Sequence, residues 1–200
     1  MTLQAGMTAV VTGGGGGIGR SIVLALADRG LKTYSLDIDD VKNAETASHS
    51  TVIVPLHCDV GDPAAILDTF SQILETNTID VLVNNAGIFI GNSYLVGTYK
   101  EALDAFDRQM AVNTRATYLC TKMVAPGTAA RGHGAILTIV TNHLARRLFP
   151  PSDSEQAYDA TKWAQYQLNE SMDAELKRHG IRVNALCPAS TRTPMLQNFF

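Results

Sequence analysis

Hydrophobic residues along the chain alternate between short continuous runs and longer stretches with helical spacing. Continuous apolar runs, such as residues 52–54 and 81–83, are typical of strands that are buried on both faces of a parallel sheet. The expected strands cover residues 8–12, 32–37, 52–57, 80–84, 135–141 and 182–187. The expected helices cover residues 18–29, 63–75, 101–124 and 155–179.

This alternation of strand and helix predicts an α/β fold with a doubly wound, mainly parallel sheet and helices on both faces, which is the Rossmann fold. No repeat or shift of composition divides the 200 residues, so we expect one domain, 1–200. Two prolines and a polar run make residues 148–156 a loop. Residues 193–200 read as the start of a helix that ends on two phenylalanines, which suggests that a further segment is missing.

A glycine-rich turn with the sequence TGGGGGIG, residues 12–19, connects the first expected strand to the first helix. Strand, glycine turn and helix form the context of a dinucleotide site, because the backbone can approach a pyrophosphate that the helix N-terminus attracts. Two registers fit, Gly14, Gly16 and Gly19 or Gly13, Gly17 and Gly19. A flexible linker is the alternative, but a linker would not lie between a buried strand and an amphipathic helix.

Asp37 ends the second expected strand about 20 residues after the glycine turn, where an acidic side chain binds the adenosine ribose. A carboxylate there accepts hydrogen bonds from the ribose hydroxyls and repels a 2′-phosphate. Neither the turn nor the residues beside Asp37 offer a lysine or arginine for that phosphate. We therefore expect NAD rather than NADP, the alternative being that residues 37–40 form a solvated turn that caps a helix.

Composition narrows the class of protein. Hydrophobic residues make up 46% of the chain and charged residues 18%, as in a folded soluble protein, and the net charge of −3 indicates neither a nucleic-acid nor a membrane partner. Three widely spaced cysteines predict reduced thiols and no metal site. No leader pattern or membrane-spanning run is present, so we expect a cytoplasmic protein.

Tyr158 and Lys162 lie four residues apart in a helical pattern and therefore project from one helix face. A free tyrosine, with a pKa of about 10, is a poor base. A neighbouring ammonium favours the phenolate and lowers this pKa, so that the tyrosine can exchange a proton with an alcohol. This four-residue spacing is common in sequences and carries weight only with other motifs.

Those other motifs make the chain resemble the short-chain dehydrogenase/reductase family along nearly its whole length. The landmarks occur in the family's order, and they are residues 12–19, Asp37, the CDV run at 58–60, the NNAG run at 84–87, Asn113, Tyr158 with Lys162, and residues 188–195. Together they select the register of Gly13, Gly17 and Gly19. The alternative for the NNAG run alone is a plain strand-ending turn.

The resemblance implies a role for each site residue. Tyr158 is the acid/base, Lys162 binds the nicotinamide ribose and tunes Tyr158, and Asn113 kinks its helix and holds a water in a proton relay. The expected catalytic residues are Asn113, Thr141, Tyr158 and Lys162. The expected cofactor-binding residues are Gly13, Gly16, Gly17, Ile18, Gly19, Asp37, Asp59, Val60, Asn85, Ala86, Gly87, Tyr158, Lys162, Pro188, Thr191 and Thr193.

Within that cofactor set, Asp59 accepts a hydrogen bond from the adenine amino group, with the backbone of Val60 beside it. The run from Asn85 to Gly87 lines the adenosine ribose, and Thr193 holds the carboxamide.

Two departures from the family pattern affect the substrate end. Thr141 stands where the family usually has a serine, and it keeps the hydroxyl donor on a stiffer side chain. The interval from Thr141 to Tyr158 is lengthened by residues 148–156, where Ser152 or Ser154 is an alternative donor on a poorly fixed loop. Ala189 replaces the usual glycine and narrows the space beside the nicotinamide.

The function that follows is hydride transfer between NAD(H) and a secondary alcohol or ketone. Asn142, His143, Arg146 and Arg147 follow Thr141 and favour a polar or acidic small molecule, unless the two arginines form a solvated basic turn. A non-catalytic NAD(H) sensor or assembly protein on the same fold is the alternative. Epimerases and dehydratases that share the tyrosine–lysine spacing are disfavoured by the short chain, and the family implies a homodimer or homotetramer.

Overall fold

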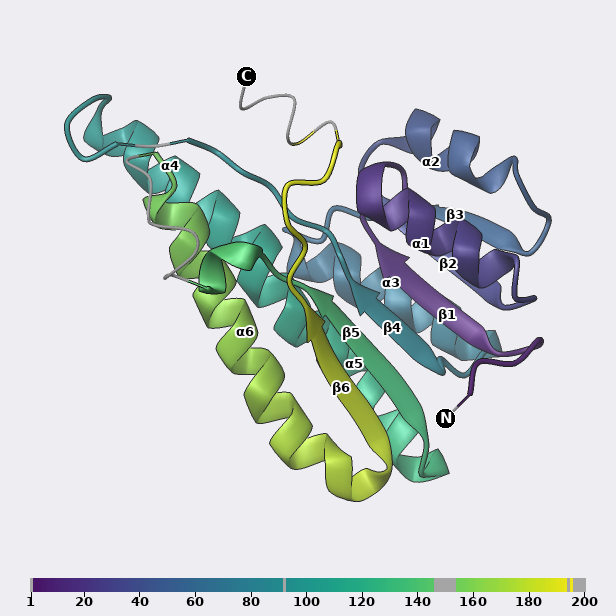
Figure 1. Ribbon diagram of the computed structural model, residues 1–200. Coiled ribbons are helices and arrows are strands. Elements are labelled where there is room, and N and C mark those ends of the chain that lie inside the picture. Colours follow the sequence, from purple (N-terminus) through teal and green to yellow (C-terminus); the bar gives the residue numbers. More distant parts are fainter. Residues whose placement is uncertain (1, 92, 146–153, 194, 196–200) are drawn as a thin grey trace.

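Six parallel strands form one sheet in the order β3-β2-β1-β4-β5-β6 (Figure 1). The computed structural model describes residues 2–91, 93–145, 154–193 and 195. The strands are β1 (Thr8–Thr12), β2 (Lys32–Asp37), β3 (Ile53–His57), β4 (Val81–Asn84), β5 (Gly134–Ile139) and β6 (Ile181–Leu186). In register, Val10 of β1 lies between Tyr34 of β2 and Leu82 of β4. The order reverses between β1 and β4, so the chain winds away from β1 in both directions, as in a Rossmann fold.

Helices cover both faces of the sheet. On one face lie α1 (Gly17–Ala27) and α2 (Asp40–Ala47), and on the other lie α3 (Pro63–Thr76), α5 (Ala116–Arg131) and α6 (Gln156–Leu176). α4 (Tyr99–Gln109) projects beyond the sheet beside the start of α6 (Figure 1). The predicted doubly wound α/β fold is therefore confirmed.

Alternate strand residues enter two separate hydrophobic cores. Val10 and Leu82 pack with Phe70 of α3 in one core, whereas Val11 packs with Val23 of α1 in the other. All of these side chains are buried. A strand with a core on each face has no solvent-facing position, which is why its sequence is a continuous apolar run.

Strand boundaries follow the prediction closely, but two helical predictions were wrong. The pattern did not predict α2, whose sequence DVKNAETA is mostly polar, although Asp39 caps it by accepting from the backbone N–H of Lys42 at 3.0 Å. This cap agrees in part with the alternative assignment of residues 37–40 as a capping turn.

The second error concerns the long helix expected over residues 101–124. The chain instead forms α4, then a π-helix over Met110–Arg115, then α5, which continues to Arg131. A π-helix inserts one residue into the helical ladder and is frequent at functional sites. Here it contains Asn113, whose side chain is fully buried.

Within the described ranges, no helix combines the length and the apolar character that crossing a bilayer requires.

Candidate active site

A cavity of about 770 Å³ opens at the carboxyl ends of the strands, around the point between β1 and β4 where the strand order reverses. Doubly wound sheets bind their ligands at this position, and its volume is in the range of small-molecule sites. Every residue predicted for catalysis or cofactor binding lines this cavity except Gly19 and Asn113. Those two residues are not part of its lining.

The glycine turn has the geometry of a backbone cradle. Gly13 and Gly17 adopt positive φ angles of 68° and 53°, where side chains are strained. A Cβ on Gly19 would lie 2.0 Å from the carbonyl oxygen of Gly13, whereas one on Gly16 would meet nothing within 4 Å. Gly19 belongs to both registers, so the positive φ angles of Gly13 and Gly17 and the open space at Gly16 are what favour the register of Gly13, Gly17 and Gly19. Gly16 is the N-cap of α1 and provides no side-chain cap, so the first N–H groups of the helix are uncapped where Gly17 and Ile18 line the cavity.

The residues after β4 hold this turn in place. The Asn85 side-chain amide donates to the carbonyl oxygens of Thr12 at 2.9 Å and Gly13 at 3.0 Å. The Thr12 hydroxyl in turn accepts from the backbone N–H groups of Asn85 and Ala86 at 3.1 Å. The side chains of Thr12 and Asn85 thus hold the carboxyl ends of β1 and β4 together. The resemblance implied a ribose contact for Asn85 but not this structural role.

The Asp37 carboxylate links the glycine turn to the start of α2. It accepts from the N–H groups of Gly15 at 2.8 Å and Asp39 at 2.9 Å, and it lines the cavity. Lys42 lines the same cavity, bound to Asp39 by an ion pair of 2.6 Å. The expectation that no cation lies near Asp37 was therefore wrong, because α2 brings Lys42 back beside it.

Arg108 is a cavity residue that the sequence analysis missed. Its guanidinium lies 3.0 and 3.2 Å from the two carboxylate oxygens of Asp59, and it also lines the cavity. Arg108 and Asp59 are 49 residues apart, and an arginine on the polar helix α4 gives no signal in the sequence beyond a solvated charge. The pair places a fixed cation beside the residue predicted to contact adenine.

Tyr158 is buried at the opposite end of the cavity. Burial raises the pKa of its phenol to about 12, the hydrogen bond with Thr141 opposes this shift, and the nearby charges of Asp159 and Glu155 add to it. The lowered pKa expected from Lys162 is therefore not seen. The sequence shows the neighbouring ammonium, but it does not show that the pair is buried or that acidic residues surround it.

Lys162 has its ammonium buried behind Tyr158. It donates to the carbonyl oxygen of Ile139 at 3.0 Å and to Oε1 of Gln165 at 2.9 Å, and it lies 5.7 Å from the centroid of the Tyr158 ring. Burial lowers the pKa of Lys162 to about 8. The fold thus places the tyrosine and the lysine side by side, as the spacing predicted.

Asn113 braces the segment that follows the NNAG run. Its side chain accepts from the N–H of Ile88 at 2.8 Å and donates to the Ile88 carbonyl and to Oγ1 of Thr161, each at 3.0 Å. Thr161 precedes Lys162 in α6. Through Asn113, the π-helix therefore ties the loop after β4 to the helix that carries the tyrosine and the lysine.

Thr141 lies beyond the end of β5, two residues later than the strand itself. It is buried and begins the short 3-10 helix Asn142–Leu144, and its hydroxyl accepts from the backbone N–H of His143 at 3.3 Å. Ser154 is exposed and does not line this cavity, which leaves Thr141 as the hydroxyl beside Tyr158 among the described residues. Ser152, Arg146 and Arg147 lie outside those residues.

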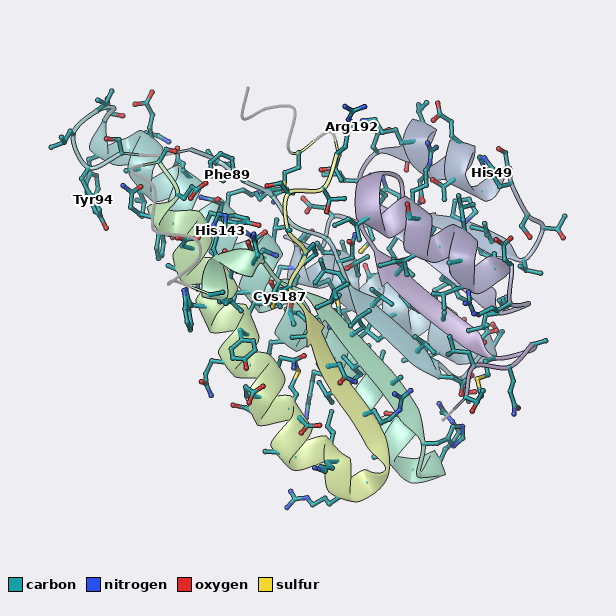
Figure 2. The ribbon with its side chains drawn as sticks, viewed as in Figure 1. His49, Phe89, Tyr94, His143, Cys187 and Arg192 are labelled. Atoms are coloured by element: carbon teal, nitrogen blue, oxygen red, sulfur yellow. The ribbon has the colours of Figure 1, made fainter. Side chains whose placement is uncertain are left out.

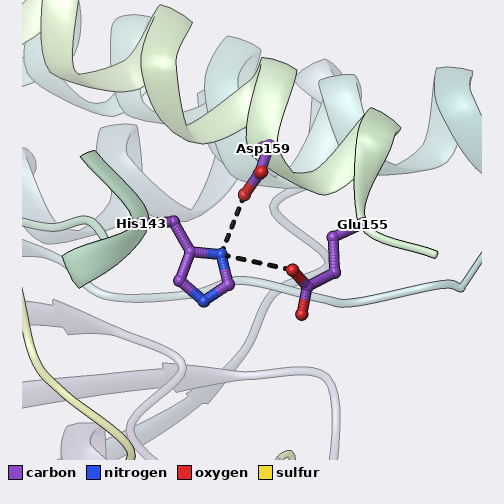
Figure 3. Close-up of side chains that lie close together, drawn as sticks. All are labelled: His143, Glu155 and Asp159. Atoms are coloured by element: carbon purple, nitrogen blue, oxygen red, sulfur yellow. Dashed lines mark hydrogen bonds and ion pairs between the residues drawn. The ribbon is translucent and has the colours of Figure 1, made fainter. Parts of the chain in front are cut away.

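His143 forms a second polar cluster that the sequence did not indicate as a unit (Figure 3). Its Nδ1 lies 2.9 Å from Oδ1 of Asp159 and 3.7 Å from Oε2 of Glu155. Both His143 and Glu155 line the cavity. The three side chains are of types that bind metal ions, and their ligand atoms lie within 4.8 Å of one another. The sequence analysis did not predict this cluster, because it judged metal binding from the three cysteines.

Comparison with known proteins gives consistent matches. A sequence model of the family described as short chain dehydrogenase matches residues 7–200. The chain is 35% identical over 198 residues to 2-(R)-hydroxypropyl-CoM dehydrogenase of Xanthobacter autotrophicus, which covers 94% of this chain and 76% of the relative. It is 34% identical over 197 residues to L-xylulose reductase of Cavia porcellus, covering 96% and 74%.

Solved structures agree with the sequence matches. A 3-ketoacyl-(acyl-carrier-protein) reductase of Brucella melitensis complexed with NADH has a TM-score of 0.86 at 28% identity, covering 98% of this chain and 80% of that one. A putative NAD(P)-dependent gluconate 5-dehydrogenase of Beutenbergia cavernae with bound NADP has a TM-score of 0.85 at 27% identity, covering 98% and 76%. The chain therefore belongs to the short-chain dehydrogenase family of nicotinamide-dependent oxidoreductases.

Proposed function

We propose that this oxidoreductase transfers a hydride between NAD(H) and a secondary alcohol or ketone, with Tyr158 as the acid/base. The observation that carries the proposal is that Tyr158, Thr141 and Lys162 meet at one end of the cavity whose other end is the glycine turn. Both halves of the reaction thus have a place in a single cavity. The nicotinamide, when bound, supplies or takes up the hydride.

Tyr158 carries the proton side of this reaction. With a pKa of about 12, its phenol keeps its proton at neutral pH and can give it to the oxygen of a ketone as that oxygen gains charge. In the reverse direction the phenolate takes the hydroxyl proton of the alcohol. The Thr141 hydroxyl, hydrogen-bonded to Tyr158, orients the substrate oxygen.

Cofactor preference rests on the cavity end formed by β2 and α2. The Asp37 carboxylate is positioned to accept from ribose hydroxyls and to repel a 2′-phosphate. Lys42 is the cation that would attract such a phosphate, but Asp39 already binds it at 2.6 Å. We infer a preference for NAD on this ground, although relatives with bound NADP and with NADH both share the fold.

The remaining assignments are part of the same proposal. Asn113 holds a water that passes protons towards Lys162, Thr193 binds the carboxamide, and the Asp59–Arg108 pair meets the adenine. We expect residues 1–200 to act as one domain, in a homodimer or homotetramer, on a small molecule in the cytoplasm.

Replacing Tyr158 tests the proposal directly. In Tyr158→Phe we expect turnover of alcohols and ketones to fall by about 10²- to 10⁴-fold, since general acid–base catalysis contributes that much. NADH affinity, measured by fluorescence titration, should stay within about twofold, because the removed hydroxyl serves proton transfer. Tyr99→Phe, on the exposed side of α4, is the matched control and should be fully active.

The same assay separates an enzyme from a non-catalytic NAD(H) sensor. A parent protein that binds NADH but turns over no alcohol or ketone would support the sensor and contradict the proposal. Equal turnover by Tyr158→Phe and its parent would remove Tyr158 from the mechanism.

A further inference from the structure

Among the described residues, the hydrogen-bond and ion-pair partners of the His143 imidazole both meet one ring nitrogen, Nδ1. Asp159 accepts from its Nδ1 at 2.9 Å, and Glu155 lies 3.7 Å from the same nitrogen. The side chains of Asp159 and Glu155 are only 8% and 14% exposed, so both carboxylates are largely removed from water. Figure 3 shows that the other ring nitrogen, Nε2, points away from Asp159 and from α6.

This arrangement determines the tautomer of the His143 ring and therefore what Nε2 can bind. Since Asp159 is an acceptor, Nδ1 carries the proton, and Nε2 of the neutral ring is then a hydrogen-bond acceptor. Among the described residues no hydrogen bond to Nε2 is present, and His143 lines the cavity. A group in the cavity beside Nε2 must therefore donate a hydrogen bond to satisfy it.

His143 also lies at the right place relative to the reacting atoms. Its backbone N–H donates to the Thr141 hydroxyl at 3.3 Å, and its ring centroid lies 6.1 Å from that of Tyr158 in an edge-to-face arrangement. A substrate oxygen held between Tyr158 and Thr141 would therefore bring a substituent on the carbon next to the reacting one near His143.

The charge around the ring disfavours anionic substrate groups. Among the described residues, the two carboxylates of Asp159 and Glu155 make the surroundings of the ring negative. A carboxylate or phosphate on the substrate would be repelled by Glu155 and Asp159 and has no proton to donate. An uncharged hydroxyl is not repelled by the carboxylates, and it has a proton to donate to Nε2.

We infer that His143 is a specificity-determining residue that accepts a hydrogen bond from a hydroxyl group next to the reacting carbon, so that the substrates are neutral α-hydroxy ketones and vicinal diols. Asp159 and Glu155 are positioning residues that hold the imidazole in this orientation. The inference rests on the proposed function, and of the polar or acidic small molecule that the sequence favoured it takes the polar, uncharged one.

Three ketones with one carbon skeleton test the inference. 2-Butanone lacks a neighbouring oxygen, 3-hydroxy-2-butanone has a hydroxyl there, and 3-methoxy-2-butanone keeps the oxygen without its proton. The purified protein should reduce the hydroxy ketone with a kcat/KM about tenfold or more above the other two, since a hydrogen bond that orients the bound substrate is worth that factor. The difference should lie mainly in KM.

Variants of His143 separate recognition from a merely structural role. His143→Phe should bring the three ketones to within about twofold of one another, whereas His143→Gln, which keeps a polar atom near the position of Nε2, should restore part of the preference. Asp159→Asn should weaken the preference by freeing the ring. His49→Phe, on the far side of the molecule at the end of α2, is the matched control and should keep the full preference (Figure 2).

The outcomes are distinct. Equal reduction of the three ketones by the parent, or a preference that survives in His143→Phe, overturns the inference and leaves the proposed function standing. A preference that disappears on dialysis against EDTA assigns the cluster to a divalent cation and also overturns it. No reduction of any ketone by a protein that binds NADH overturns the proposed function together with the inference.

Discussion

Burial acts in opposite directions on the two ionisable residues of the site. It raises the pKa of Tyr158 to about 12 and lowers that of Lys162 to about 8, because desolvation favours the neutral form of each. The lysine therefore does not simply supply a positive charge to the tyrosine. Its ammonium is bound by Ile139 and Gln165, so its first structural role is to connect α6 to the end of β5.

Lys162 should make the stability of the protein depend on pH. Its pKa is about 8 in the folded chain and 10.5 as a free side chain, so between these values the unfolded chain binds more protons. The free energy of unfolding should therefore rise as the pH rises from 8 to 10.5, by about 3 kcal/mol from this residue. Urea unfolding of the parent and of Lys162→Met across this range isolates the effect.

Lys162→Met lacks the titrating group, whereas Tyr158 is present in both proteins and its contribution cancels. The stability of the parent relative to the variant should increase over this pH range. A constant difference between the two proteins would show that the lysine is not desolvated as the structure indicates.

Asp37 should set the choice between the two nicotinamide cofactors. Asp37→Asn keeps the size of the side chain and an acceptor for the Gly15 N–H, but it removes the charge that opposes a 2′-phosphate. The ratio of kcat/KM for NADPH to that for NADH should rise by about tenfold, which corresponds to about 1.4 kcal/mol. Asp40→Asn, a neighbouring exposed carboxylate, is the control, and the same rise there would point to general charge and not to ribose contact.

At the scale of elements, patterns that depend on burial were predictable from the sequence. The six strands were located to within two residues at each end because both of their faces are buried. The missed helix α2 has no apolar stripe, and its capping residue Asp39 has no distinctive signal beside other acidic residues. The π-helix was not predictable, since one inserted residue does not alter the apolar pattern on either side of it.

The site residues likewise divide into those that the sequence predicts and those that it does not. Gly13, Asp37, Tyr158 and Lys162 were predictable because local spacing and the order of motifs fix their places. Pairs that meet only after folding, such as Arg108 with Asp59, were not predictable from the sequence. The cluster at His143 was not predictable either. Contacts of this kind depend on how far each helix is rotated about its axis, which the sequence pattern does not specify.

The glycine turn allows a matched test within one element. A methyl group on Gly19 would lie 2.0 Å from the Gly13 carbonyl oxygen, so Gly19→Ala must displace the turn. We expect the free energy of unfolding to fall by about 2 kcal/mol or more, as for other overpacked sites. Gly16→Ala has open space and an extended φ of −156°, so it should cost less than about 1 kcal/mol by chemical denaturation. Equal losses in the two variants would contradict the cradle geometry.

At the scale of the whole molecule, the cavity is the place where the two halves of the sheet meet. Thr12 and Asn85 link the carboxyl ends of β1 and β4, and Asn113 links the loop after β4 to α6. The segment after β6 also lines the cavity, with Pro188 and Thr191. A ligand that fills this cavity contacts residues from both halves, so its binding energy should stabilise the fold as one unit.

NADH should therefore raise the melting temperature of the whole chain in a single transition. A ligand that binds only the folded state at 100 times its dissociation constant stabilises it by about 2.7 kcal/mol. For a chain of 200 residues, each kcal/mol shifts the midpoint by about 2–4 °C, so calorimetry should show an increase of about 5–10 °C. Gly19→Ala, with a displaced turn, should show a much smaller increase under the same conditions. A split transition in which only one part moves would mean that the cofactor is held by one half of the sheet, and it would contradict a site built across the junction of β1 and β4.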